Sequence, residues 1–126
     1  MRIARVSAVF IGLALGLGAV TLDAGELLQM QVTPAIQREP AIVTVRVTVE
    51  TSADNRMLQV TAKSPAAART TQVPIDGAND TVPLKVFEFK NLPPALYEIT
   101  GVLIGTQGTR ATIVRLAKIE PAAGSR

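Results

Sequence analysis

The stretch that decides the fold is residues 42–50, which read Ile-Val-Thr-Val-Arg-Val-Thr-Val-Glu. From residue 43 onward apolar and polar residues alternate, and a period of two places the two kinds on opposite faces of a β-strand. Valine and threonine branch at Cβ, which suits a pleated and half-buried surface. Burial of four valines stabilises a fold by at most roughly 6–12 kcal/mol before the loss of chain entropy. We therefore predict a strand whose core face carries Val43, Val45, Val47 and Val49.

The composition limits the chemistry that the chain can perform. Its 126 residues are enough for one domain; 48% of them are apolar and only 3% are aromatic, so the core must be aliphatic. There is no Cys and no His. These absences exclude disulfides, thiolate nucleophiles and the side chain that most often serves as a general base or metal ligand. We expect a protein that is not an enzyme and that holds no cofactor.

The charge is close to balanced, with 13 basic and 10 acidic residues and a net charge of +3. After the first 24 residues, eleven basic and nine acidic residues remain. A surplus of two is no basic patch, and no exposed aromatic residue is evident that could stack on bases. The candidate basic residues also fall on different predicted strands, so we expect no nucleic-acid partner; they are Arg46, Lys63, Arg110 and Arg115.

The first 24 residues have the layout of a secretory signal. Arg2 and Arg5 precede 17 uncharged residues, 6–22, and small residues such as Ala19 and Thr21 lie near the end of this run. Residues 1–24 are therefore expected to be a cleaved signal peptide, or alternatively an uncleaved anchor helix that keeps contact with the membrane through residues 6–22. Either reading predicts an exported protein, periplasmic or extracellular in the first case and anchored to the inner membrane in the second.

After the signal, short apolar runs alternate with clusters of Gly, Pro, Asn and Asp. Pro34 and Pro40 bracket an expected loop, and residues 121–126 an expected loose tail. Regular turn signals at this spacing predict an all-β fold, a single antiparallel β-sandwich over residues 25–120. About seven strands are expected, at residues 27–33, 42–50, 56–63, 70–75, 82–90, 96–104 and 109–119. Their core faces are expected to include Leu58, Val60, Tyr97, Ile99 and Leu103.

The predicted strand at residues 82–90 has an irregular apolar pattern. Leu84 and Val86 fall on one parity, whereas Phe87 and Phe89 fall on the other. We predict either a bulge near Val86 or a strand that is covered on both faces.

Residues 86–100 read Val-Phe-Glu-Phe-Lys-Asn-Leu-Pro-Pro-Ala-Leu-Tyr-Glu-Ile-Thr. This passage resembles the strand–corner–strand segment of immunoglobulin-like domains, fibronectin type III in particular. It is also similar to the corner of carboxypeptidase-regulatory-like sandwiches of exported bacterial proteins. The resemblance implies a corner at Leu92 and Pro93, followed by a tyrosine corner in which the ring of Tyr97 is buried and its hydroxyl bonds nearby backbone. It implies a fold and no particular activity.

Residues 76–80, Asp-Gly-Ala-Asn-Asp, form the strongest turn signal in the chain. Asp76, Asn79 and Asp80 offer oxygen ligands of the kind that Ca²⁺ takes, but no Glu completes the set. Two readings stay open, a weak calcium loop and an ordinary hairpin turn.

These observations favour an exported, non-enzymatic module that acts as a protein-binding or structural component of the bacterial envelope or the secreted fraction. The alternative is a membrane-tethered accessory subunit of an envelope complex. A carbohydrate-binding module and a hydrolase are less favoured, because Trp is absent and no catalytic set is present. An unknown protein partner would bind by strand addition at the edge strand of residues 70–75 or at the last strand.

Overall fold

The computed structural model describes residues 27–123, so the expected signal or anchor segment lies outside the described residues. Residues 27–123 form eight β-strands and one 3-10 turn. No helix within this range is long and apolar enough to cross a membrane. The elements are, in chain order, β1 (Leu28–Thr33), β2 (Ile36–Arg38), β3 (Ile42–Val49), β4 (Asn55–Lys63), β5 (Ala68–Pro74), η1 (Gly77–Asn79), β6 (Leu84–Lys90), β7 (Ala95–Gly105) and β8 (Gly108–Glu120).

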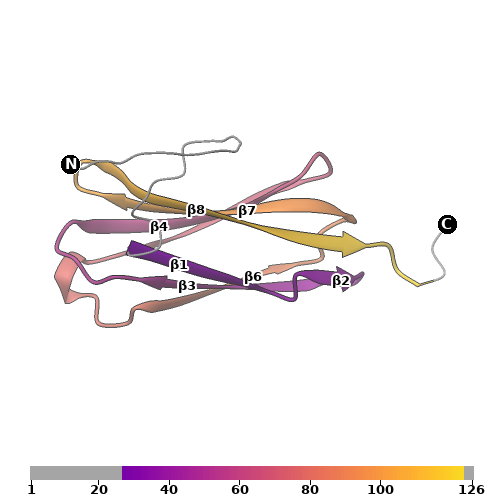
Figure 1. Ribbon diagram of the computed structural model, residues 1–126, viewed down its shortest axis with the longest axis horizontal. Coiled ribbons are helices and arrows are strands. Elements are labelled where there is room, and N and C mark those ends of the chain that lie inside the picture. The colour runs from indigo at the N-terminus through magenta and orange to yellow at the C-terminus, as the bar shows by residue number, and fades with distance from the viewer. Residues whose placement is uncertain (1–26, 124–126) are drawn as a thin grey trace.

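The strands form two sheets, which confirms the expectation of an all-β fold. A three-stranded sheet has the order β1-β3-β6, and a five-stranded sheet has the order β2-β8-β7-β4-β5. Figure 1 shows the two layers, with β8, β7 and β4 in the upper one and β3 and β6 in the lower one. Neighbouring strands are antiparallel, except that β2 runs parallel to β8.

The core lies between the sheets and is built from the alternation of β3. Three valines of β3 are fully buried and Val49 is 4% exposed, while Arg46 and Thr48 point outward. The facing sheet contributes alternate residues of β4, β7 and β8, since successive side chains of a strand point to opposite faces. The buried set includes Val43, Val45, Val47, Leu58, Val60, Leu92, Tyr97, Ile99 and Leu103.

Eight strands agree with the expected number of about seven, but the prediction of a loop between Pro34 and Pro40 was wrong. Residues 36–38 form β2, which pairs with residues 118–120 of β8. Its three residues are too few to show a period in the sequence, and the strand exists because the end of β8 lies beside it. This pair is also the exception to the antiparallel arrangement.

Neither prediction for the irregular pattern of residues 82–90 holds. β6 pairs with β3 over seven consecutive residue pairs without a bulge. Phe89 is buried and Phe87 packs against the core, whereas Leu84 and Val86 are 45% and 53% exposed. The strand is therefore regular and covered on one face, with two apolar side chains in solvent.

Candidate functional site

The loop from β5 to β6 holds the residues considered for calcium. Asp76 precedes the 3-10 turn η1, and its carbonyl accepts a hydrogen bond from the backbone N–H of Asn79 at 2.9 Å. Gly77 has a φ of +51°, and a Cβ at this position would lie 3.0 Å from the carbonyl oxygen of Ala53. The loop therefore requires glycine here, both for its backbone conformation and for its close approach to the neighbouring loop.

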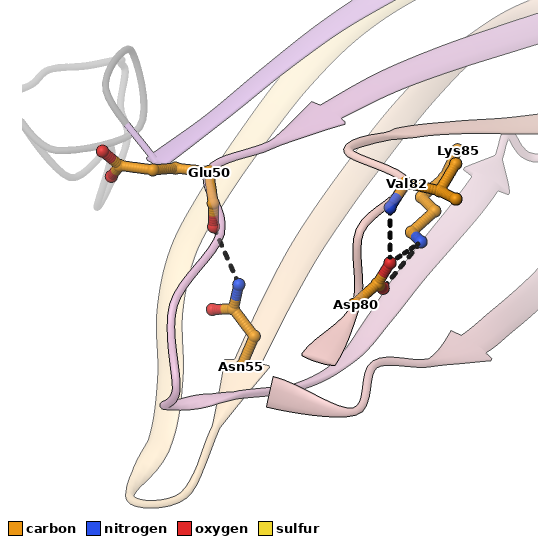
Figure 2. Close-up of polar contacts among 5 residues, drawn as sticks. All are labelled: Glu50, Asn55, Asp80, Val82 and Lys85. Atoms are coloured by element: carbon orange, nitrogen blue, oxygen red, sulfur yellow. Dashed lines mark hydrogen bonds and ion pairs between the residues drawn. The ribbon is translucent and has the colours of Figure 1, made fainter. Parts of the chain in front are cut away.

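Asp80 is the centre of the polar contacts in this loop. Its carboxylate accepts a hydrogen bond from the Val82 N–H at 3.0 Å, and the Lys85 ammonium lies 2.7 and 2.9 Å from its two oxygens (Figure 2). The Lys85 and Asp80 side chains are only 15% and 17% exposed. The hydrogen bond from Lys85, followed by that from Val82, lowers the pKa of Asp80 below its ordinary value of 3.8.

This geometry argues against the calcium loop, but the hairpin-turn reading is wrong as well, because β5 and β6 belong to different sheets and the loop crosses from one sheet to the other. A cation at Asp80 would have to replace the Lys85 ammonium or lie beside it, and both arrangements cost electrostatic energy. Within residues 27–123, no three Asp or Glu side chains gather closely enough to hold a metal ion. Asp80 instead fastens the loop to Lys85, the second residue of β6.

Acid is expected to weaken the contact between Asp80 and Lys85. Because the pKa of Asp80 is lower in the folded protein than the ordinary 3.8, the ion pair stabilises the fold above that pH and its contribution is lost as the pH falls below it. Asp80→Asn should cost about 1 kcal/mol at pH 7 and should make the stability less dependent on pH below 4. Urea unfolding between pH 2 and pH 7 measures both effects. Asp76→Asn is the control, because the Asp76 side chain makes no capping hydrogen bond; equal acid slopes for both variants would contradict the assignment.

Asn55 forms the second polar cluster at this end of the sandwich, and it was not among the predicted site residues. It is 1% exposed. Its amide nitrogen donates to the Glu50 carbonyl at 2.8 Å (Figure 2), and its amide oxygen accepts from the Arg110 guanidinium at 2.5 Å. Asn55 thereby joins the loop after β3 to Arg110, the third residue of β8. The sequence indicated this residue only by the position of an Asn directly before an apolar strand.

The hollow between these two clusters is too small for a substrate. It lies between Val49, Asn55, Ile75 and Lys85, and its volume is about 10 Å³. That volume corresponds to about one water molecule. The polar side chains on either side of it, Asp80 with Lys85 and Asn55 with Arg110, hold loops and strands together.

The corner at residues 92–97 is also structural. Leu92 is buried, and the ring of Tyr97 is fully buried between the sheets. The Tyr97 hydroxyl donates a hydrogen bond to the carbonyl of Pro93 at 2.7 Å. This is the contact that the resemblance implies for a tyrosine corner, and it satisfies a polar group that would otherwise be buried without a partner.

The two strands considered for partner binding have different surroundings. At the last strand, β2 pairs with residues 118–120 and β1 packs against β8. β5 pairs with β4 on one side and ends the five-stranded sheet on the other. Its pairing with β4 runs over seven residue pairs without a register shift. Within the described range, β5 therefore offers a regular edge with free backbone groups along one side.

The four basic residues considered for nucleic acid do not gather on one surface. Arg46 projects from the outer face of the three-stranded sheet, and Lys63 ends β4 in the other sheet. Arg110 is bound to Asn55. They provide no continuous track of positive charge of the kind that binds a phosphate backbone.

No protein-family model matches the sequence, and no curated protein matches it. Solved structures do match. Superoxide reductase (neelaredoxin) from Ignicoccus hospitalis aligns with a TM-score of 0.55 and 12% identity, over 75% of this chain and 81% of that one. Two variants of the same enzyme align with TM-scores of 0.55 and 0.54 over 79% of this chain. At 12–13% identity, this likeness shows that the described residues share an all-β fold with that enzyme, and it shows the fold alone.

Proposed function

We propose that this chain is an exported, non-enzymatic immunoglobulin-like module that binds another protein by adding a strand of that protein to β5. The middle of the β5 edge, between Arg69 and Pro74, carries the proposal. Natural sheets protect their edges with charges, prolines, bulges or covering segments. Residues Thr70 to Val73 contain no charge and no proline, and the pairing with β4 has no bulge.

The two edge strands of the other sheet, β1 and β6, are protected better. β1 packs against β8, and β6 carries Lys85, Glu88 and Lys90 among its seven residues. Charges at such positions discourage a second strand from pairing. On β5, Arg69 donates hydrogen bonds to the carbonyls of Lys90 and Asn91 and so fastens the beginning of β5 to the end of β6. The uncharged part of β5 that follows is the better template for a partner strand.

The immunoglobulin-like assignment is supported by the two-sheet order and by the Tyr97–Pro93 corner. The activity of the structural neighbours is not carried over. Superoxide reduction transfers one electron and requires a redox-active group, and redox metals in proteins are held mainly by imidazole and thiolate ligands. The chain has no His and no Cys, so its residues do not fit such a group.

Cross-linking in cells tests the binding surface. A photoreactive residue in place of Gln72, on the edge strand, should form an adduct with a different protein. The same residue in place of Gln59, which lies opposite Gln72 on β4 and faces the same side of the sheet, is the matched control and should form none. Thr70→Lys should abolish the Gln72 adduct, because a charge on the edge opposes pairing. Equal adducts at both positions, no adduct, or an adduct only with a second copy of this chain would overturn the proposal.

Export and tethering are separated by the mature N-terminus. Edman sequencing of the exported protein should find a new N-terminus between residues 19 and 26, as expected for a cleaved signal. An intact N-terminus in the membrane fraction would favour the alternative, an accessory subunit tethered to an envelope complex. Recovery of the protein in the cytosol with an intact N-terminus would contradict both.

A further inference from the structure

A chequered group of four exposed residues lies on the outer face of the five-stranded sheet, and we call it the leucine–charge patch. It consists of Leu96 and Glu98 on β7 and Leu116 and Lys118 on β8. In the register of these strands Leu96 lies opposite Lys118, and Glu98 lies opposite Leu116. The two leucines therefore occupy one diagonal of the group, and the two opposite charges occupy the other.

The members of the patch are unusually free for such side chains. Leu96 and Leu116 are 57% and 56% exposed. The ion pairs among residues 27–123 are Arg38–Glu120 and Lys85–Asp80, so neither Glu98 nor Lys118 forms an ion pair there, although Lys63 of β4 lies opposite Glu98 in the register of β4 and β7. Apolar area continues around the patch with Ile36, opposite Lys118, and with Val114, the next outward residue of β8; these are 65% and 41% exposed. Contiguous exposed apolar surface of this kind marks interaction sites.

We propose that the leucine–charge patch is a contact surface between two copies of this chain. A twofold axis along the leucine diagonal, parallel to the sheet, places Leu96 against Leu96 and Leu116 against Leu116 of the second copy. The same rotation exchanges the ends of the other diagonal. Each Lys118 then faces the Glu98 of the second copy, so the interface contains two equivalent ion pairs around an apolar centre.

The arrangement also agrees with the way sheets pack. Neighbouring strands are about 4.8 Å apart, and two residues along a strand span about 6.8 Å, so the diagonal is inclined at about 35° to the strands. Rotation about it crosses the strands of the two copies at about 70°, which is close to the orthogonal class of sheet packing. The charge pattern favours a second copy as the occupant, because the four residues of the patch are complementary to themselves under this rotation.

Charge reversal tests the proposal with the full chain, purified as the cell leaves it. Sedimentation equilibrium should show a concentration-dependent dimer for the wild type. Lys118→Glu and Glu98→Lys should each raise the dimer dissociation constant at least about 100-fold, because each replaces two attractive pairs by two repulsive ones. Glu88→Lys is the matched control, since Glu88 is exposed on the outer face of the other sheet, and it should dimerise as the wild type does.

Combining the two substitutions, either in one chain or by mixing the two single variants, provides the decisive measurement. The double variant Lys118→Glu/Glu98→Lys should regain the dimer, and an equimolar mixture of the two single variants should form a heterodimer. A general loss of folding predicts neither result, and circular dichroism of each single variant checks the fold directly. All variants share residues 1–26, so association through that segment would not follow this pattern. A monomeric wild type, or single variants that stay separate when mixed, would overturn the proposal.

Discussion

Val45→Asp is expected to abolish the cooperative folding of the protein at neutral pH. Val45 is fully buried in the middle strand of the three-stranded sheet, between Val32 of β1 and Phe87 of β6. A carboxylate at this position has no partner and would be removed from water, which costs several kcal/mol even if the group takes up a proton. Since a domain is stable by only about 5–15 kcal/mol, the loss is comparable to the whole. Far-UV circular dichroism and urea unfolding measure it.

Two further variants make this result interpretable. Val45→Thr keeps the shape of the side chain and buries one unpaired hydroxyl, so it should fold and lose about 1–3 kcal/mol. Val86→Asp makes the same change of charge on the outer face of the same sheet. Val86 is 53% exposed and lies opposite Arg46, so this variant should stay within about 0.5 kcal/mol of the wild type. If Val45→Asp unfolded at the same urea concentration as the wild type, this face of β3 would not be in the core.

Asn55→Leu is expected to lose about 2–3 kcal/mol although the new side chain is apolar and of similar size. The substitution leaves the Glu50 carbonyl and the Arg110 guanidinium without their partner, and the cost of an unsatisfied group exceeds the net value of the bond. Equilibrium urea unfolding followed by circular dichroism gives the change in the free energy of unfolding.

A double-mutant cycle assigns that loss to the contact with Arg110. Arg110→Met should destabilise the wild type, but it should cost much less in the Asn55→Leu background, because the hydrogen bond is then already absent. Additive effects of the two substitutions would show that Asn55 acts through its other contacts. If the urea midpoint of unfolding of Asn55→Leu equalled that of the wild type, the structural role of Asn55 would be contradicted.

The two surfaces proposed for binding lie on the same sheet and are tested separately. The β5 edge and the leucine–charge patch are separated by β4, because the sheet order is β8-β7-β4-β5. A charge at Thr70 opposes pairing at the edge, whereas charge reversal at Glu98 or Lys118 acts on the outer face. A partner strand at β5 and a second copy on the face of β7 and β8 would therefore occupy different positions, and failure of one proposal leaves the other standing.

Much of the architecture could be predicted because it depends on local periodicity. The alternation of β3 indicated which of its faces is buried, and the turn clusters indicated where strands end. The same reasoning misjudged β6, because Leu84 and Val86 are apolar and yet face solvent. Exposed apolar residues are common on folded proteins, so composition along a strand does not by itself identify its covered face when both parities are apolar.

What the sequence alone determined is the all-β class and the narrow range of available chemistry. Both follow from residue type and from a period of two, which are properties of neighbouring residues. Only the tertiary structure decided the parallel pairing of β2 with β8, the bond between Asn55 and Arg110, and the diagonal arrangement of Leu96, Glu98, Leu116 and Lys118. These features depend on which strands are neighbours and in what register, and that is settled by packing between segments far apart in the chain.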